Sequence, residues 1–276
     1  MSKVVLVTGA SSGIGLATAL AATDAGYTTV ATVRRGSAEL AAAGVDTCRL
    51  ELTDPDSVEA CVAGVVERHG RLDALVNNAG IANSSPTLEL STMDALRHQL
   101  EVNFFGTIAL SRAAMPHLRA TGGRLLTVSS VRGVRGQPFN EAYSAAKFAV
   151  EGFMEALAPV AAAVGVRVSL IEPAAVLDTR FIASSTLDPA RLLAESGPYE
   201  AAFRAYRSWV AGGAVEGAQT PDEVAKVILH TLADADPALR VQTSEYARAY
   251  VAEKLTDPTG RDQLTTTREW VTPASS

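Results

Sequence analysis

The residues Val4-Val5-Leu6-Val7-Thr8 are followed directly by Gly9-Ala10-Ser11-Ser12-Gly13-Ile14-Gly15. The apolar run predicts a buried strand, and the glycines predict a tight turn into a helix. Glycine lets a pyrophosphate approach the backbone, and the N–H groups at a helix N-terminus attract its negative charge. The stretch therefore predicts a dinucleotide-binding turn, although glycines also punctuate ordinary strand–helix connections. The residues expected to bind are Gly9, Ser11, Ser12, Gly13, Ile14 and Gly15.

Strand-like and helix-like segments alternate along most of the 276 residues. Nearly continuous apolar runs predict strands that are buried on both faces. Strands are expected at Val4–Thr8, Thr28–Val33, Thr47–Leu50, Ala74–Asn77, Arg124–Ser129, Arg167–Ile171 and near Leu239–Gln242. Helices are expected at about 13–25, 55–69, 92–119, 142–164 and 221–234. This order predicts a single α/β domain with a doubly wound Rossmann fold, whose parallel seven-stranded sheet is flanked by helices on both faces.

The segment 180–219 fits neither the helical nor the strand period well. We interpret it as a lid on the substrate side of the domain, and a plain surface insertion is the alternative. It is rich in aromatic residues, which either close over an apolar substrate or make a core or subunit contact. These residues are Phe181, Tyr199, Phe203, Tyr206 and Trp209.

Charge and cysteine content exclude some classes of protein. The net charge of −6 argues against a nucleic-acid binder, which needs a basic face. No stretch is long and apolar enough to predict a membrane span, and the first residues do not resemble a secretory signal. Cys48 and Cys61 are expected to be reduced and structural, and the four histidines lack metal-ligand spacing. We therefore expect a cytoplasmic protein that binds neither metal, membrane nor nucleic acid.

Two arginines, Arg34 and Arg35, follow the second predicted strand. NAD-binding folds place an acidic residue there to accept hydrogen bonds from the adenosine ribose. A guanidinium instead binds a 2′-phosphate through paired, charge-assisted hydrogen bonds. The arginines therefore favour NADP(H) over NAD(H), with a solvated loop as the alternative.

Tyr143 and Lys147 are four residues apart at the start of a predicted helix, so both point to one face. Reduction of a carbonyl needs a proton donor at oxygen while hydride arrives at carbon. A phenol has a pKa of about 10, and a neighbouring ammonium group is expected to lower it. The pair is a weak signal by itself, but Ser130 ends the preceding strand region and offers a hydroxyl for the same oxygen.

Taken together, these motifs resemble the short-chain dehydrogenase/reductase family in its one-domain branch. Thr8 to Gly15 match the family pattern Thr-Gly-xxx-Gly-Ile-Gly, and Ser130 has the family's spacing to Tyr143, which favours it over Ser129. The resemblance implies a catalytic set of Asn103, Ser130, Tyr143 and Lys147, in which Asn103 holds a water that relays protons to Lys147. Lys147 is also implied to hold the nicotinamide ribose. The segment Asn77-Asn78-Ala79-Gly80 matches the family motif that packs beside the cofactor.

The resemblance implies further contacts to the cofactor. Glu51 and Leu52 occupy the place where the family binds adenine. Pro173, Val176 and Thr179 resemble the segment over the nicotinamide amide, although Ala174 replaces the usual glycine and Thr179 comes one residue late.

The segment from residue 130 to 152 is similar to the 17β-hydroxysteroid and retinol dehydrogenase subgroup. This implies an apolar, steroid-like ketone or alcohol as substrate. The family commonly pairs through the helices that hold Asn103 and Tyr143, which implies a homodimer or homotetramer. Two alternatives stay open: a catalytically silent NADP(H)-binding sensor or scaffold, and an isomerase or dehydratase of sugar nucleotides. Silent relatives usually lose the tyrosine or the lysine, and both are present here.

Overall fold

The computed structural model describes residues 2–34, 36–82, 87–177, 189–213 and 217–273. Seven parallel strands form one sheet in the order β3-β2-β1-β4-β5-β6-β7. The strands are β1 (Val4–Val7), β2 (Thr28–Val33), β3 (Asp46–Arg49), β4 (Ala74–Asn77), β5 (Arg124–Val128), β6 (Arg167–Glu172) and β7 (Arg240–Gln242). The predicted fold class is therefore confirmed, and the strand order reverses beside β1, where such folds bind ligands.

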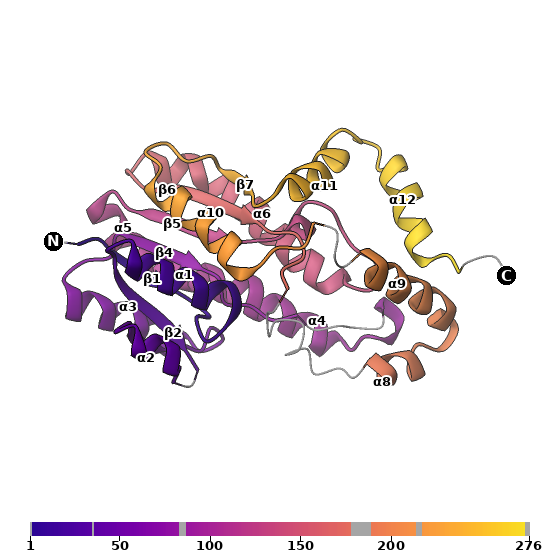
Figure 1. Ribbon diagram of the computed structural model, residues 1–276, viewed down its shortest axis with the longest axis horizontal. Helices are drawn as coiled ribbons and strands as arrows, with labels where there is room; N and C mark the ends of the chain where they lie inside the picture. The colour runs from indigo at the N-terminus through magenta and orange to yellow at the C-terminus, as the bar shows by residue number, and fades with distance from the viewer. Residues whose placement is uncertain (1, 35, 83–86, 178–188, 214–216, 274–276) are drawn as a thin grey trace.

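Helices cover both faces of the sheet (Figure 1). The helices α1 (Gly13–Asp24), α2 (Ala38–Ala42) and α10 (Pro221–Ala233) contribute to one hydrophobic core. The helices α3 (Pro55–His69), α5 (Thr107–Thr121) and α6 (Glu141–Ala162) contribute to the other. Strand β1 serves both, because Val4 and Leu6 point to the second core while Val5 and Val7 point to the first. The sheet is thus buried on both faces, which explains its continuous apolar strands.

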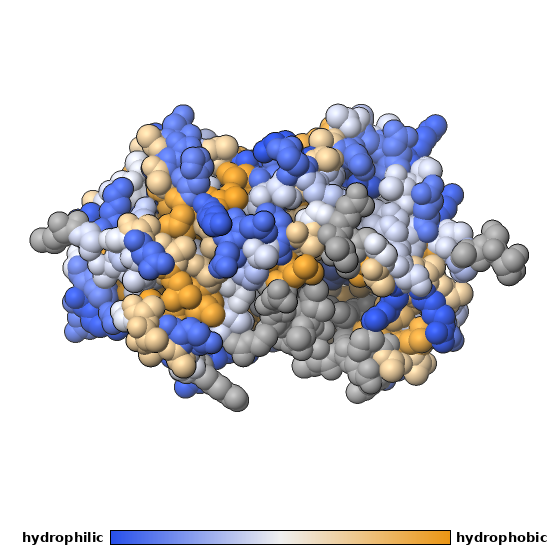
Figure 2. All heavy atoms as spheres, viewed as in Figure 1, coloured by the Kyte–Doolittle hydropathy of each residue, from blue (hydrophilic) through white to orange (hydrophobic). Residues whose placement is uncertain are grey.

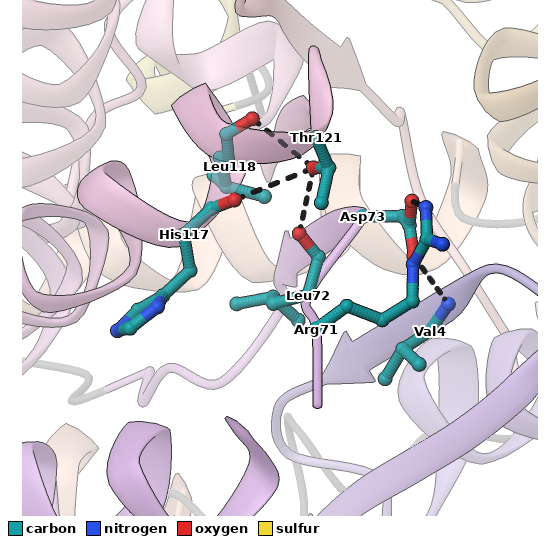
Figure 3. A network of polar contacts seen from close by, with 7 residues as sticks. All are labelled: Val4, Arg71, Leu72, Asp73, His117, Leu118 and Thr121. Atoms are coloured by element: carbon teal, nitrogen blue, oxygen red, sulfur yellow. Dashed lines mark hydrogen bonds and ion pairs between the residues drawn. The ribbon is translucent and has the colours of Figure 1, made fainter. Parts of the chain in front are cut away.

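Polar residues fix the edge of the sheet at which the strands begin (Figure 3). Asp73 accepts hydrogen bonds from the Val4 backbone N–H at 2.8 Å and from the Arg71 Nε at 2.8 Å. Thr121, at the end of α5, donates to the Leu72 carbonyl at 2.9 Å. These contacts join β1, β4 and α5 at the edge opposite the carboxyl ends of the strands. In folds of this kind ligands bind at the other edge, outside the carboxyl ends of the strands.

The helix predicted over 92–119 is divided. It consists of α4 (Met93–Leu100), a π-helical segment η2 (Glu101–Gly106) and α5. The Asn103 side chain inside η2 pairs with the backbone of Ile81, and the Thr107 hydroxyl donates to the Asn103 carbonyl at 3.0 Å. A side chain that hydrogen-bonds to the backbone competes with the regular hydrogen bonds of an α-helix. π-helical turns are frequent at functional sites.

The C-terminal part holds helices that the sequence did not predict. Helices α11 (Glu245–Leu255) and α12 (Arg261–Val271) follow β7, and within 180–219 the structure describes α8 (Pro189–Ala194), a 3-10 turn η4 (Gly197–Tyr199) and α9 (Glu200–Gly213). Aromatic rings hold them together: Trp209 of α9 stacks on Trp270 of α12 at 4.0 Å, and Phe203 packs against Phe139 at 5.0 Å. The aromatic residues of α9 therefore make a core contact, and Phe181 lies outside the described residues. In Figure 1 these helices gather at the end of the molecule away from the N-terminus.

Cys48 of β3 and Cys61 of α3 are free thiols whose sulfur atoms lie 3.3 Å apart. Among the described helices none is long and apolar enough to cross a membrane. The surface is mixed on the face shown in Figure 2, where apolar residues gather over α1 and α10.

Candidate active site

The turn between β1 and α1 requires glycine at two places. Gly9 has a φ of +67°, and a Cβ there would lie 2.8 Å from the Ala79 Cα. A Cβ on Gly15 would lie 2.5 Å from both the Asn78 Nδ2 and the Gly9 carbonyl oxygen. Contacts this short do not occur in proteins without displacement of the backbone. Because Gly9 and Gly15 have no Cβ, the end of β1, the start of α1 and the segment after β4 can pack directly against one another.

Thr8 and Asn78 fix this turn to the end of β4. The Thr8 hydroxyl accepts hydrogen bonds from the backbone N–H groups of Asn78 and Ala79, each at 2.9 Å. The Asn78 Nδ2 in turn donates to the Thr8 carbonyl at 2.8 Å. Ala79 and Gly80 follow in the segment beside the glycine turn. Sequence reasoning used Thr8 only as part of a pattern, and its position at the strand end is the signal for this role.

The N-terminus of α1 suits an anion. Ser12 occupies the N-cap position in an extended conformation and makes no capping hydrogen bond through its side chain to a described residue. The N–H groups of Gly13, Ile14 and Gly15 belong to the first helical turn, where no helical carbonyl precedes them. That turn contains no acidic residue. The donors and the cradle that the glycines leave open therefore fit the pyrophosphate of a dinucleotide.

The ends of β2 and β3 carry the residues expected at the adenosine. Arg34 follows β2 directly and is exposed, and Arg35 lies outside the described residues. Glu51 is exposed, and its Oε1 accepts a hydrogen bond from the Thr53 hydroxyl at 3.1 Å. Leu52 packs against η2, because a Cβ on Gly106 would lie 2.7 Å from its Cβ.

Ser130, Tyr143 and Lys147 are brought together and buried, with at most 8% of each side chain exposed. Ser130 follows β5, and the other two lie one turn apart on α6. The Ser130 side chain is hydrogen-bonded to the Tyr143 phenol. The Lys147 Nζ donates to the Val128 carbonyl at 2.8 Å and lies 5.8 Å from the centre of the Tyr143 ring.

The pKa of Tyr143 responds to burial and to two neighbouring residues. Burial raises the pKa of the phenol, while the positive charge of Arg132 and the hydrogen bond with Ser130 act to lower it. The ammonium group of Lys147 donates to the Val128 carbonyl and lies near the same ring. Burial lowers the pKa of Lys147 itself to about 8, which Glu151 partly opposes. That Lys147 lowers the pKa of Tyr143 stays a prediction.

Asn103 is buried and holds the segment after β4. Its Oδ1 accepts from the Ile81 N–H at 2.8 Å, and its Nδ2 donates to the Ile81 carbonyl at 2.9 Å. Gln99 donates to the same carbonyl at 2.8 Å. The side chain of Asn103 is thus committed to the backbone of Ile81. The sequence analysis missed that Gln99 and Asn103 hold the backbone of Ile81, because neither Gln99 nor Ile81 belongs to a motif that indicates such a contact.

The segment after β6 lies against Ser130. The Pro173 carbonyl accepts from the Val131 N–H at 3.0 Å and from the Ser130 hydroxyl at 3.4 Å. Val176 forms a parallel bridge with Gln219. Thr179 lies outside the described residues.

A cluster of charged residues from α6, β6 and β7 adjoins Lys147: Glu151, Glu172 and Arg240. Arg240 of β7 contacts the Glu151 Oε2 at 3.0 Å and the Glu172 Oε1 at 3.4 Å. Gln242 donates to the other oxygen of Glu172 at 2.8 Å. Burial and the neighbouring Glu151 raise the pKa of Glu172 to about 7. Sequence reasoning missed this group, because its members lie far apart in the chain.

Comparisons with known proteins agree with this arrangement. A model of the short chain dehydrogenase family matches residues 3–189. Human 17-beta-hydroxysteroid dehydrogenase type 1 is 36% identical over 280 residues, which cover 95% of this chain and 84% of the relative. A short-chain dehydrogenase from Streptomyces avermitilis is 32% identical, with a TM-score of 0.78 over 98% of this chain and 97% of the other.

An alcohol dehydrogenase from the archaeon Thermococcus sibiricus, solved in complex with 5-hydroxy-NADP, is 26% identical. Its TM-score is 0.70 over 88% of this chain and 96% of that chain. The family model covers more than half of the chain, and the human relative matches nearly all of it. The chain therefore belongs to the short-chain dehydrogenase family of oxidoreductases.

Proposed function

We propose that this protein transfers hydride between NADP(H) and a ketone, an aldehyde or a secondary alcohol. The observation that carries the proposal is the buried set of Ser130, Tyr143 and Lys147 at the same edge of the sheet as the glycine turn. The turn would hold the pyrophosphate through the first-turn N–H groups of α1. The bound nicotinamide would supply the redox chemistry, and the protein supplies position and electrostatics.

Each member of the set has a defined task in this proposal. Tyr143 donates its phenolic proton to the carbonyl oxygen during reduction and accepts it during oxidation. Ser130 orients that oxygen, since its hydroxyl is hydrogen-bonded to the phenol. Lys147 would hold the nicotinamide ribose, and Asn103 would support a water that returns protons to Lys147. Pro173, Val176 and Thr179 would contact the nicotinamide side.

The preference for NADP(H) rests on Arg34 and Arg35. Arg34 is exposed directly after β2, where a 2′-phosphate would lie, and no acidic residue follows that strand before Glu39. The Thermococcus alcohol dehydrogenase, whose complex contains a modified NADP, supports the same choice. Glu51 and Leu52 would border the adenine, with Ser11 near the phosphate.

We expect an apolar, steroid-like substrate. Human 17-beta-hydroxysteroid dehydrogenase type 1 supports this class by its name. The aromatic residues of α9 supply an apolar surface near Phe139, and 180–219 would act as a lid on this side. We propose the cytoplasm as the compartment, where the neighbouring thiols of Cys48 and Cys61 would stay reduced.

A spectrophotometric screen tests the function. NADPH oxidation is followed with a panel of steroid ketones, aromatic ketones and aldehydes, and NADP⁺ reduction is followed with the corresponding alcohols. At least one apolar carbonyl compound is expected to be reduced. Tight binding of NADPH without turnover of any compound would instead support a catalytically silent binder.

The Arg34→Ala variant tests the cofactor preference. Loss of a charge-assisted contact to the 2′-phosphate is expected to raise the KM for NADPH about tenfold and to leave that for NADH unchanged. Steady-state kinetics with both cofactors measure the effect. Arg97→Ala, on exposed α4, is the matched control for loss of a surface charge. Equal changes for the two cofactors would contradict the assignment.

We further propose a homodimer, or a homotetramer built from such dimers, through α5, α6 and the adjoining η2. Phe105, Phe148 and Phe153 expose 52%, 42% and 41% of their surface on these elements. The ring of Phe104 lies 5.0 Å from that of Phe105 and 6.0 Å from that of Phe153, so these three residues form one aromatic cluster. A cluster of this size on the surface favours contact with a second copy.

The double variant Phe105→Glu/Phe148→Glu is expected to shift the protein to monomers, because four charges would face one another across a symmetric contact. Light scattering after gel filtration measures the mass. Leu264→Glu, on exposed α12, is the control. A dimeric double variant would show that another surface makes the contact.

A further inference from the structure

Arg132 lies two residues after Ser130, in the 3-10 turn η3 (Val131–Gly133). Its backbone N–H donates to the Ser130 Oγ at 3.2 Å, which fixes the residue beside the proposed substrate hydroxyl. Val131 packs against Ala247 and Val251 of α11. The strand β5 that precedes this turn is two positions from β1 in the sheet. Arg132 therefore lies between the catalytic set and the C-terminal helices, apart from the glycine turn.

The positive charge of Arg132 acts on tyrosines from three helices. Burial raises the pKa values of Tyr143 of α6, Tyr206 of α9 and Tyr250 of α11, and the charge of Arg132 opposes the rise at all three. Tyr250 also packs against the hydrophobic cluster that contains Val131, the neighbour of Arg132 in the chain. The Tyr206 ring lies 5.3 Å from that of Phe139 and 6.1 Å from that of Trp209. The charge of Arg132 thus acts on the proposed proton donor and on two tyrosines of the C-terminal helices.

The guanidinium of Arg132 forms no ion pair with a carboxylate of the described residues. Its Nη1 is buried and has no hydrogen-bond partner among them, which is unusual for a buried guanidinium N–H group. Arg135 also has two buried nitrogens without a hydrogen-bond partner, but its Nη1 binds the Glu253 carboxylate at 2.5 Å and its guanidinium stacks over the Tyr250 ring at 4.6 Å. Arg135 is therefore ion-paired, whereas Arg132 has a buried donor without a partner two residues from Ser130.

We propose that Arg132 binds a carboxylate group of the substrate, so that the enzyme selects carbonyl compounds and alcohols that join an apolar body to a carboxylate. This deepens the proposed function and rests on it. A guanidinium binds a carboxylate through two parallel N–H···O bonds, and nearby aromatic rings strengthen them by excluding water. Tyr206 and Tyr250 contact the apolar body, while the reacting carbonyl lies at Tyr143.

Pairs of aromatic ketones that differ only as carboxylic acid and methyl ester test the proposal. We expect kcat/KM of the unaltered protein to be about 10- to 100-fold higher for the acid, a range typical of a charged hydrogen-bonded contact. Arg132→Met is expected to bring the ratio to about one, mainly through KM, and Arg132→Lys to retain part of it. Any influence of Arg132 on the proton donor Tyr143 acts on acid and ester alike, so the ratio isolates recognition of the carboxylate.

Two controls accompany the series. The dissociation constant of NADPH should be the same in Arg132→Met, which shows that the fold and the cofactor site are intact. Arg248→Met, an exposed arginine on α11, should leave the acid-to-ester ratio unchanged. Equal efficiency with acid and ester in the unaltered protein, or an unchanged ratio in Arg132→Met, overturns the proposal.

Binding without turnover separates this proposal from the hydride-transfer function. Calorimetry of the NADP⁺-saturated protein gives dissociation constants for the same acids and esters. Tighter binding of the acids that is lost in Arg132→Met supports the carboxylate site even if no carbonyl is reduced, in which case the proposed reaction fails. Reduction of the esters without tighter binding of the acids supports the reaction and overturns the role of Arg132.

Discussion

Replacement of Tyr143 by Phe is expected to lower kcat about 10³-fold, because the phenol is the proposed proton donor and general acid–base groups typically contribute 10²- to 10⁴-fold. The change removes one oxygen and keeps the ring, which is 8% exposed and packed at the start of α6. Stability and the NADPH dissociation constant should therefore change little. Activity is measured from single-turnover NADPH oxidation with the best carbonyl of the screen.

A second tyrosine provides the control for Tyr143→Phe. Tyr27 is half-buried just before β2, at the edge of the sheet opposite the site, and packs against the core formed by α1 and α10. Tyr27→Phe should keep full activity. A Tyr143→Phe protein that keeps about a tenth of the activity or more would show that another group delivers the proton.

Replacement of Gly15 by Ala is expected to destabilise the protein and to abolish tight binding of NADPH. The added Cβ would lie 2.5 Å from the Asn78 Nδ2 and from the Gly9 carbonyl oxygen, so the turn must open. Overpacking of this kind costs about 1–3 kcal/mol. Urea unfolding measures the loss of stability, and fluorescence titration measures NADPH binding.

Gly64→Ala is the matched control for this test. Gly64 lies within α3, where a Cβ would meet no atom within 4 Å, so alanine should stabilise the helix by up to about 1 kcal/mol. The two glycine-to-alanine changes are thus expected to have opposite signs. A Gly15→Ala protein that is as stable as the unaltered one and binds NADPH would show that the close contacts do not restrict this turn.

The sheet and the helices against it could be predicted because their patterns are local. The helix expected over about 55–69 is confirmed as α3, and the Asp54 side chain before it accepts from the Asp56 N–H at 3.0 Å. Residues Val4 to Val7 predict a doubly buried strand, which is also confirmed. The family resemblance implies that Ser130, Tyr143 and Lys147 form one set, and the structure brings the three buried residues together.

The remaining features depend on contacts between distant segments. Helix α12 carries few buried residues, and its Trp270 stacks on Trp209, 61 positions earlier, so a contact between distant segments sets its place in the fold. The π-turn depends on Asn103 meeting Ile81. The ammonium group of Lys147 turns to a strand carbonyl, which the i, i+4 spacing to Tyr143 cannot reveal.

The contact between Thr8 and Asn78 also bears on how the chain folds during synthesis. β1 can pair with β2 soon after both emerge, but its other edge waits for β4, and the glycine turn has no Asn78 to hold it until the end of β4 is made. Non-local parallel pairings of this kind are slow to form. A ribosome-bound chain that ends before residue 78 therefore lacks the hydrogen bonds between Thr8 and Asn78 that fix the glycine turn. The turn is expected to bind a dinucleotide only after β4 and Asn78 have been synthesised.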